Sequence, residues 1–176
     1  ITNKYAETDS VKSYKNKVQF GFGCKNKSRI KYWDNIKNIV IVPPSLNYLS
    51  SYDNTIHKLK QTLGQHWNVT SDLSITEECV YIVRPGVGML THCVENNIPI
   101  IALFDPFDSS EIITLAEQVQ ILKIGCAHNT KNIKELLDGY FIGYKLKKFF
   151  SNNIYNKIDL EKEGYKTALH LKKLML

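Results

Sequence analysis

The segment Cys79–Asp108 limits the possible folds of this chain more than any other. It opens with an apolar run that breaks at Arg84-Pro85-Gly86, continues with a helix-like pattern, and reaches a second apolar run at Pro99. Short apolar runs bounded by proline and glycine are typical of buried strands, and the segment between them has helical spacing. We therefore predict a βαβ unit with a glycine turn at its first strand-to-helix junction, where α/β sheets bind phosphorylated ligands.

The region before this segment predicts the same architecture. The β-branched run Asn38–Val42 is followed by two prolines and is expected to be a buried parallel strand. A loop over 45–53 is expected next, then a helix with Ile56, Leu59 and Leu63 on one face and an end at Gly64. A short strand is expected over 67–70.

The region after Pro99 continues the alternation of strands and helices. A strand is expected from Pro99 to Phe104, and Asp108 with Glu111 resembles a capping box that starts a helix. A further helix is expected from about 129 to about 139. Strands that alternate with helices predict an α/β, Rossmann-like three-layer domain with a mostly parallel sheet and helices on both faces.

We divide the chain into three parts. Residues 1–17 are polar and aperiodic and are expected to be a linker or a frayed terminus. Residues 18–143 form the Rossmann-like domain, in which Val18–Gly23 is a weak strand candidate. Residues 144–176 contain a basic amphipathic stretch and a terminal helix pattern, which we expect to pack on the domain or on a partner.

Composition narrows the classes of partner. The 23 Lys and Arg against 17 Asp and Glu give a net charge of +6, yet Arg29 and Arg84 are the only arginines. Proteins that recognise nucleic acid usually contact its bases and phosphates through arginine guanidinium groups, so we expect no nucleic-acid partner. A mildly basic surface suits an anionic ligand or an acidic membrane face, although a solvated lysine-rich surface is the commonest explanation.

The four cysteines show no paired metal spacing, so we expect reduced thiols, no metal and no cofactor. No apolar stretch approaches the length of a membrane span. We expect a cytoplasmic location, with peripheral contact to a membrane as an option.

The glycine turn itself allows two interpretations. Gly86-Val87-Gly88 departs from the dinucleotide fingerprint because residue 91 is Thr, and no Gly-Lys-Ser/Thr of a P-loop follows. The first interpretation is an anion site. The two glycines leave the backbone without Cβ atoms at the start of the helix, near Met89, where free N–H groups and the helix dipole favour an anion. The alternative is that glycine only meets a steric requirement of the bend.

Other polar residues near the turn also carry two interpretations each. Arg84 is either a phosphate partner or an arginine paired with a nearby carboxylate. His92 is either a site residue one helical turn after Gly88 or a solvated or capped histidine. Asp108 and Ser109 either bind sugar hydroxyls at the strand ends or cap the next helix. Cys93 and His92 are neighbours on one helix and cannot form a nucleophile and base pair, so the catalytic residues stay unknown.

Arg84-Pro-Gly-Val-Gly88, the helix to Asn96, and Asn97-Ile98-Pro99 together resemble the donor-binding half of GT-B fold glycosyltransferases. The closest likeness is to the family of the lipid-linked N-acetylglucosaminyltransferase of peptidoglycan synthesis and of plant and bacterial glucosyltransferases. The likeness covers residues 38–138, and Leu122-Lys-Ile-Gly125 matches the family's Leu-x-x-x-Gly step with one residue fewer.

The resemblance implies a role for each matching position. Gly86, Val87, Gly88 and Met89 would hold the diphosphate of a nucleotide sugar, with Arg84 beside it, and Pro44 and Ser45 would close over it. The family's ribose-binding Glu falls on His92, which can donate or accept a hydrogen bond but has no carboxylate. The sugar-binding Asp/Gln pair of the glucosyltransferases falls on Asp108 and Ser109, so only the Asp is kept.

The resemblance also implies a partner. In this family the catalytic base lies in an amino-terminal acceptor-binding domain, and nothing in this chain resembles that domain. We therefore expect a nucleotide-sugar-binding carboxyl-terminal domain, with UDP-linked donors favoured, whose acceptor half lies upstream or in a separate subunit. Alone it would be inactive. The alternatives are a non-catalytic α/β interaction module that kept this half-fold, and a GT-B-like nucleotide-sugar hydrolase or epimerase.

Overall fold

The computed structural model describes residues 2–3, 19–20, 36–45, 49–96, 98–121 and 125–136. The first four of these residues form two short strands, β1 (Thr2–Asn3) and β2 (Gln19–Phe20), which pair in parallel. β1 falls in the part expected to be a linker, and β2 falls in the Val18–Gly23 strand candidate. The helices expected over 144–176 lie outside the described residues.

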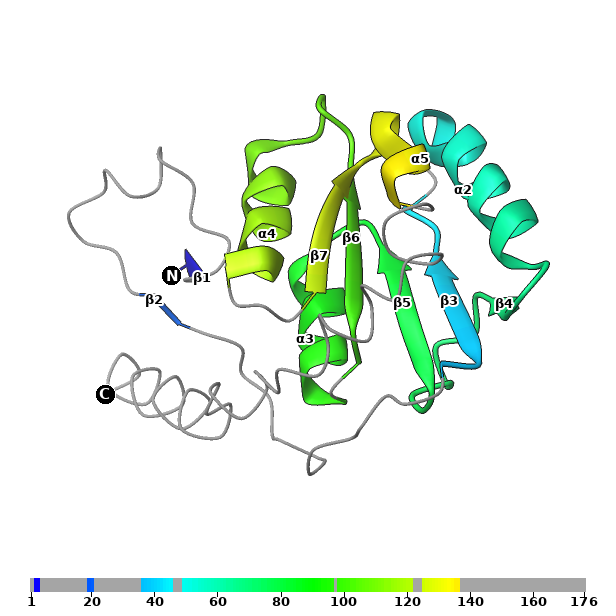
Figure 1. Cartoon of the computed structure of the whole chain (residues 1–176). Coiled ribbons are helices and arrows are strands. Elements are labelled where there is room, and N and C mark those ends of the chain that lie inside the picture. Colours follow the sequence, from blue (N-terminus) through cyan, green and yellow to red (C-terminus); the bar gives the residue numbers. More distant parts are fainter. Residues whose placement is uncertain are drawn as a thin grey trace.

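The remaining strands form one five-stranded sheet in which every neighbouring pair is parallel (Figure 1). The strands in chain order are β3 (Asn38–Val42), β4 (Asn68–Thr70), β5 (Cys79–Val83), β6 (Ile100–Phe104) and β7 (Gly125–Asn129). Their spatial order is β4-β3-β5-β6-β7. The chain thus builds outward from β3 in both directions, as in doubly wound α/β folds.

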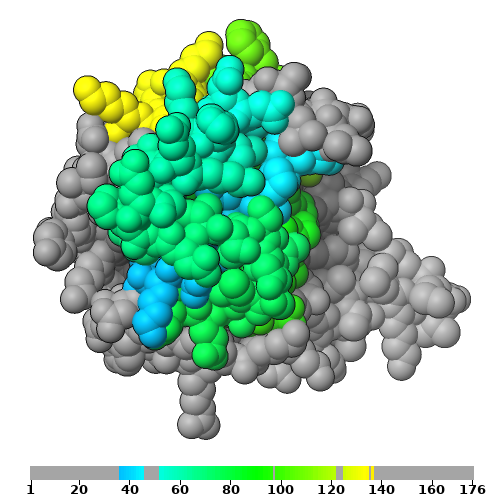
Figure 2. Space-filling view, turned by 90° about the vertical axis from the view of Figure 1, so that its right-hand side faces the viewer, coloured from blue at the N-terminus to red at the C-terminus, as the bar shows by residue number. Residues whose placement is uncertain are grey.

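Helices cover both faces of this sheet. They are α2 (Leu49–Leu63), α3 (Val87–Glu95), α4 (Ser110–Ile121), the 3₁₀ turn η2 (Thr130–Asn132) and α5 (Ile133–Leu136). α3 and α4 lie on one face and α2 and α5 on the other (Figure 1), and α2 forms the outer flank beside β3 and β4 (Figure 2). The predicted three-layer α/β architecture is confirmed.

Side chains that alternate in direction along the buried strands explain why the core has two layers, one on each face of the sheet. On β5, Tyr81 and Val83 pack with the α3 and α4 side chains, whereas Val80 and Ile82 pack with those of α2 and α5. Successive strand residues point to opposite faces, so a strand covered on both sides must be apolar throughout. This is why β5 is buried at every position.

The connection from β4 to β5 has no helix. Residues 71–78 return along the α3 and α4 side, where Ile75 packs against the core. The Tyr81 hydroxyl lies 3.1 Å from the carbonyl oxygen of Leu73 and 3.0 Å from that of Ile75. The side chain of a core residue on β5 therefore fixes this loop to the sheet.

Two expected boundaries were wrong, and one strand was missed. α2 begins at Leu49, inside the loop expected over 45–53. α4 begins at Ser110, so Asp108 lies before the helix and does not form a capping box with Glu111. The strand β7 was not expected at all. The start expected for the next helix, near Asn129, is confirmed: Asn129 is the N-cap of η2, and α5 follows directly. The end expected near residue 139 lies outside the described residues.

Candidate functional site

The order of the strands places a reversal of winding between β3 and β5. From β3 the chain crosses to β4 on one side, and β5, β6 and β7 follow on the other. In open α/β sheets, ligands bind outside the carboxyl ends of the strands at such a switch point. The loops that leave β3 and β5 contain Pro44 and Ser45 on one side and Arg84, Pro85 and Gly86 on the other. The predicted glycine turn therefore lies at the switch point.

The turn ends at the first residue of α3. Gly86 is the N-cap, with φ −133° and ψ 152°, and its carbonyl accepts the first helical hydrogen bond from the Leu90 N–H at 2.9 Å. The N–H groups of Val87, Gly88 and Met89 have no acceptor among the described residues. Such unpaired donors, together with the helix dipole, attract an anion.

The steric explanation of the two glycines is not supported. A Cβ built on Gly86 or on Gly88 meets nothing within 4 Å, and neither residue has a positive φ. Gly125 is different, because a Cβ there would lie 2.0 Å from the Ile100 carbonyl oxygen. The chain itself thus requires the glycine at 125, but not those at 86 and 88.

Arg84 forms a buried ion pair with Asp108. Its Nε and Nη2 atoms donate to Oδ1 of Asp108 at 3.0 and 2.8 Å, and the two side chains are 14% and 4% exposed. Burial alone would lower the pKa of Arg84, but the hydrogen bonds to Asp108 and its charge outweigh this and raise the pKa. Of the two interpretations of Arg84, pairing with a carboxylate is therefore observed.

The second carboxylate oxygen of Asp108 is also occupied. Oδ2 accepts a hydrogen bond from the Tyr52 hydroxyl on α2 and another from the Asp105 N–H at 2.9 Å. The Tyr52 oxygen in turn lies 3.0 Å from the same Asp105 nitrogen and accepts from it. Burial, and then the bond to Asp108, raise the pKa of Tyr52.

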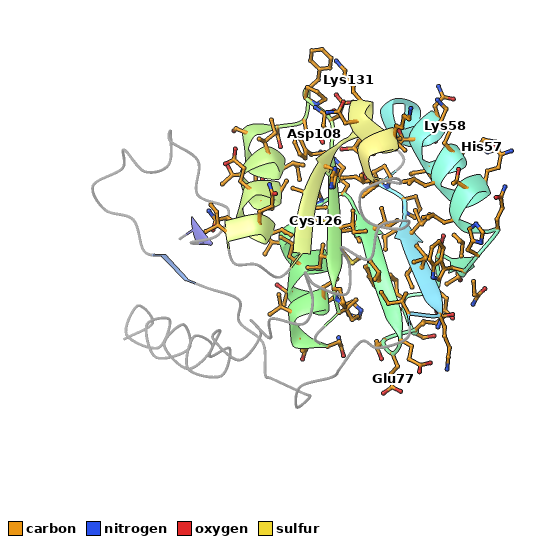
Figure 3. All side chains as sticks on the ribbon, viewed as in Figure 1. His57, Lys58, Glu77, Asp108, Cys126 and Lys131 are labelled. Carbon is orange, nitrogen blue, oxygen red and sulfur yellow. The ribbon has the colours of Figure 1, made fainter. Side chains whose placement is uncertain are left out.

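Asp105 extends these contacts to the next strand. Its Oδ2 accepts from the Thr130 hydroxyl at 3.1 Å, and its Oδ1 accepts from the Phe107 N–H at 3.0 Å. Figure 3 shows Asp108 near the upper ends of the strands, at the same end as Lys131 and opposite Glu77. We call Tyr52, Arg84, Asp105, Asp108 and Thr130 the edge network; it joins α2 to the segments that follow β5, β6 and β7.

His92 lies one helical turn beyond Gly88, in α3. Its ring centroid is 5.9 Å from that of Tyr81 on β5, and its Nδ1 is 3.5 Å from the Asn96 amide nitrogen. Its Nε2 is buried and has no hydrogen-bond partner among the described residues. His92 is therefore half-buried beside Tyr81 and does not belong to the edge network.

The other predicted residues lie at the same end of the sheet. Pro44 and exposed Ser45 follow β3, and exposed Ser109 directly precedes α4. Sequence reasoning missed Tyr52 and Thr130. Tyr52 shares a helical stripe with Ile56, Leu59 and Leu63, which is a usable signal, but Thr130 follows a strand that was not expected.

The rest of the described chain adds little to this site. No His, Cys, Asp or Glu side chains gather there in a group able to hold a metal ion, and no helix among those residues is long and apolar enough to cross a bilayer. A hollow of about 470 Å³ lies between the end of α2 and the edge strand β4, lined by Lys60, Gly64, Trp67 and residues 68–71, away from the glycine turn.

The fold and the site define this protein as a Rossmann-like α/β domain with an open glycine turn at its switch point. No protein-family model matches the sequence, and no curated protein was found to be similar to it.

Proposed function

We propose that this chain is the nucleotide-sugar-binding carboxyl-terminal domain of a glycosyltransferase. The observation that carries the proposal is the glycine turn at the switch point of a parallel sheet. Among the described residues its backbone N–H groups have no acceptor, and a Cβ at Gly86 or Gly88 would meet nothing within 4 Å. Because neither glycine is needed by the chain, the room in front of them is available to a ligand that approaches the backbone closely. A diphosphate fits this chemistry.

The proposed binding mode assigns the diphosphate to the N–H groups of Val87, Gly88 and Met89. The helix dipole of α3 favours negative charge there and would stabilise the diphosphate as it leaves the sugar. His92, whose buried Nε2 has no hydrogen-bond partner among the described residues, would contact the ribose. Pro44 and Ser45 would cover the ligand from the β3 side of the switch point. UDP is the favoured nucleotide because of the resemblance of residues 84–111 to UDP-sugar enzymes.

Glycosyl transfer also needs an acceptor site and a base. We assign both to a partner half, either a domain of a longer protein or a separate subunit. A mildly basic surface, with a net charge of +6, is compatible with an acidic membrane face near that partner.

The experiment is a titration with UDP, GDP, UMP and UDP-sugars while the backbone amides of Gly86 and Gly88 are followed by NMR. We expect saturable shifts that are strongest with a nucleoside diphosphate. The absence of a saturable shift with every nucleotide would overturn the proposal.

A proline at position 87 makes the test specific for one N–H group. Val87 is the first residue of α3, where proline is well tolerated, and the extended conformation of Gly86 is compatible with a following proline. Val87→Pro should therefore keep the fold but weaken UDP binding about tenfold, since a hydrogen bond to a charged group is lost. Val87→Ala keeps the N–H group and is the matched control, for which we expect nearly native affinity.

A non-catalytic interaction module is the second candidate. It is favoured by the packing of His92 against Tyr81 at the position where the resembled family has a ribose-binding Glu. Such a module would leave the amides of the glycine turn unaffected by any nucleotide, so the same titration separates the two functions. A nucleotide-sugar hydrolase or epimerase would bind the nucleotide as well, and product analysis would distinguish it.

A further inference from the structure

We propose, as an extension of the proposed donor site, that Asp108 and Tyr52 are positioning residues: they act on the glycine turn through Arg84 and do not select the donor sugar. The position of Asp108 in the sequence favours a sugar contact, since it falls on the sugar-binding Asp of the glucosyltransferases. Its surroundings in the folded chain favour the positioning role.

The first argument is the acceptor capacity of Asp108. The guanidinium of Arg84, the hydroxyl of Tyr52 and the N–H of Asp105 together fill the roughly four acceptor positions of a carboxylate. The side chain is only 4% exposed. A sugar hydroxyl would have to displace one of these donors, and displacing Arg84 would separate a largely buried cation from its carboxylate.

The second argument is the place of Arg84 in the chain. It is the first residue after β5 and directly precedes Pro85 and Gly86, so its side chain fixes where the turn leaves the sheet. Two guanidinium N–H groups of Arg84 converge on one carboxylate oxygen, Oδ1 of Asp108, so the contact defines an orientation as well as a distance. The orientation of Arg84 is therefore set by Asp108, which is itself held by Tyr52 and Asp105.

The third argument is the reach of the edge network. It joins α2, the segment after β5 and the segment after β6, and through Thr130 the segment after β7. These segments would otherwise move independently, because loops are the least constrained parts of such a sheet. A site made of backbone N–H groups binds tightly only if its donors are held in place before the ligand arrives.

The test compares UDP with UDP-N-acetylglucosamine and UDP-glucose. The variants are Tyr52→Phe, which removes only the hydroxyl, and Asp108→Asn, which keeps the shape of the side chain. A positioning residue affects the diphosphate, which all three ligands share, so each variant should weaken all three by a similar factor of about ten. The ratio of UDP-sugar to UDP affinity should stay at the native value.

Ile56→Val is the matched control. It removes a methylene group from the buried face of α2, one turn beyond Tyr52, without a hydrogen bond to the edge network. We expect a loss of stability but native affinity for all three ligands. The ligand-free spectrum adds an independent readout: Tyr52→Phe should shift or broaden the amide signals of Gly86 and Gly88, whereas Ile56→Val should not.

Each outcome decides the inference. Native UDP affinity in Tyr52→Phe, or an Asp108→Asn variant that weakens only the UDP-sugars, would overturn the positioning role while the proposed function stands. Failure of the native protein to bind any of the three ligands would overturn the proposed function first and the inference with it. If Asp108→Asn does not fold, Tyr52→Phe, which keeps the ion pair, carries the test alone.

Discussion

The glycine turn and the edge network are neighbours in the fold but opposites in their chemistry. In the edge network, the oxygens of Asp108 and Asp105 all accept hydrogen bonds from groups of the same chain. In the turn, the N–H groups of Val87, Gly88 and Met89 have no acceptor in the part of the chain that is described. The difference separates polar groups that are paired within the fold from polar groups that the proposed ligand would use.

The same contrast holds for the glycines. Gly125 is packed so closely that a Cβ would overlap the backbone of β6, whereas Gly86 and Gly88 face open space. A glycine at a strand-to-helix turn therefore cannot be interpreted from its presence alone. The space around it decides whether the fold needs the missing side chain.

Removing the carboxylate of the edge network should have the largest effect. Asp108→Ala removes the carboxylate that pairs with the Arg84 guanidinium, which is 14% exposed, so we expect a loss of about 3 kcal/mol or more in the free energy of unfolding. Urea denaturation measures it. Asp53→Ala, at an exposed position of α2, should change stability by less than about 0.5 kcal/mol.

A double replacement sharpens this prediction. Arg84→Met combined with Asp108→Leu removes both charges, and it should recover most of the stability lost in Asp108→Ala. A loss below about 1 kcal/mol in the single variant would show that the ion pair is not closed as described.

Gly125→Ala should come next. The added Cβ would lie 2.0 Å from the Ile100 carbonyl oxygen and 2.9 Å from Cγ1 of Val119, so β6, β7 and α4 must shift to accommodate it. We expect a loss of about 3 kcal/mol, at the upper end for overpacking. Thermal or urea unfolding measures it, and a loss no larger than that of Gly88→Ala would contradict the contrast between the two kinds of glycine.

Strong apolar patterns explain which elements were predictable. β3, β5 and β6 are rich in Val and Ile, and the stripe of Leu90, Cys93 and Val94 defined α3. β7 has the sequence Gly-Cys-Ala-His-Asn, without a β-branched residue or an alternating pattern. It is a strand because β6 offers a parallel edge and α4 leaves space only for small residues, which is information held in the tertiary structure.

The edge network likewise has residues that the sequence predicted and contacts that it did not predict. Arg84 and Asp108 were both identified as candidates, since each follows a predicted strand at the edge where ligands bind. Their contact, across 24 positions of sequence, depends on β5 and β6 being neighbours in the sheet. Tyr52 was not predicted as a site residue. The start of α2 is polar and was expected to be a loop, so the place of Tyr52 on the helical stripe was not recognised.

Alkaline pH should test the burial of Tyr52. Because burial and the bond to Asp108 raise its pKa in the folded state, the unfolded chain loses this proton first as the pH rises above about 10. Stability due to Tyr52 is therefore complete below pH 10 and falls above it, by up to about 1.4 kcal/mol per pH unit.

A variant shows how much of this fall in stability with pH is due to Tyr52. Tyr81, whose pKa burial also raises, contributes a similar slope, so Tyr52→Phe should remove about half of what Tyr52 and Tyr81 contribute together. Urea unfolding from about pH 9 to 12 measures the difference. An unchanged slope in Tyr52→Phe would mean that its hydroxyl reaches solvent.

Gly88→Ala should produce the smallest change in stability and the sharpest separation between fold and function. The new Cβ meets nothing within 4 Å, and alanine favours the helical conformation, so we expect a gain of about 0.5 kcal/mol. The same methyl group occupies the space through which a diphosphate would approach the N–H groups of the first turn of α3. UDP affinity should therefore fall while stability rises, as measured by urea unfolding and amide titration on one sample. Equal affinities in the variant and the native protein would mean that the open space at Gly88 is not used by the nucleotide, and the diphosphate would then have to bind elsewhere.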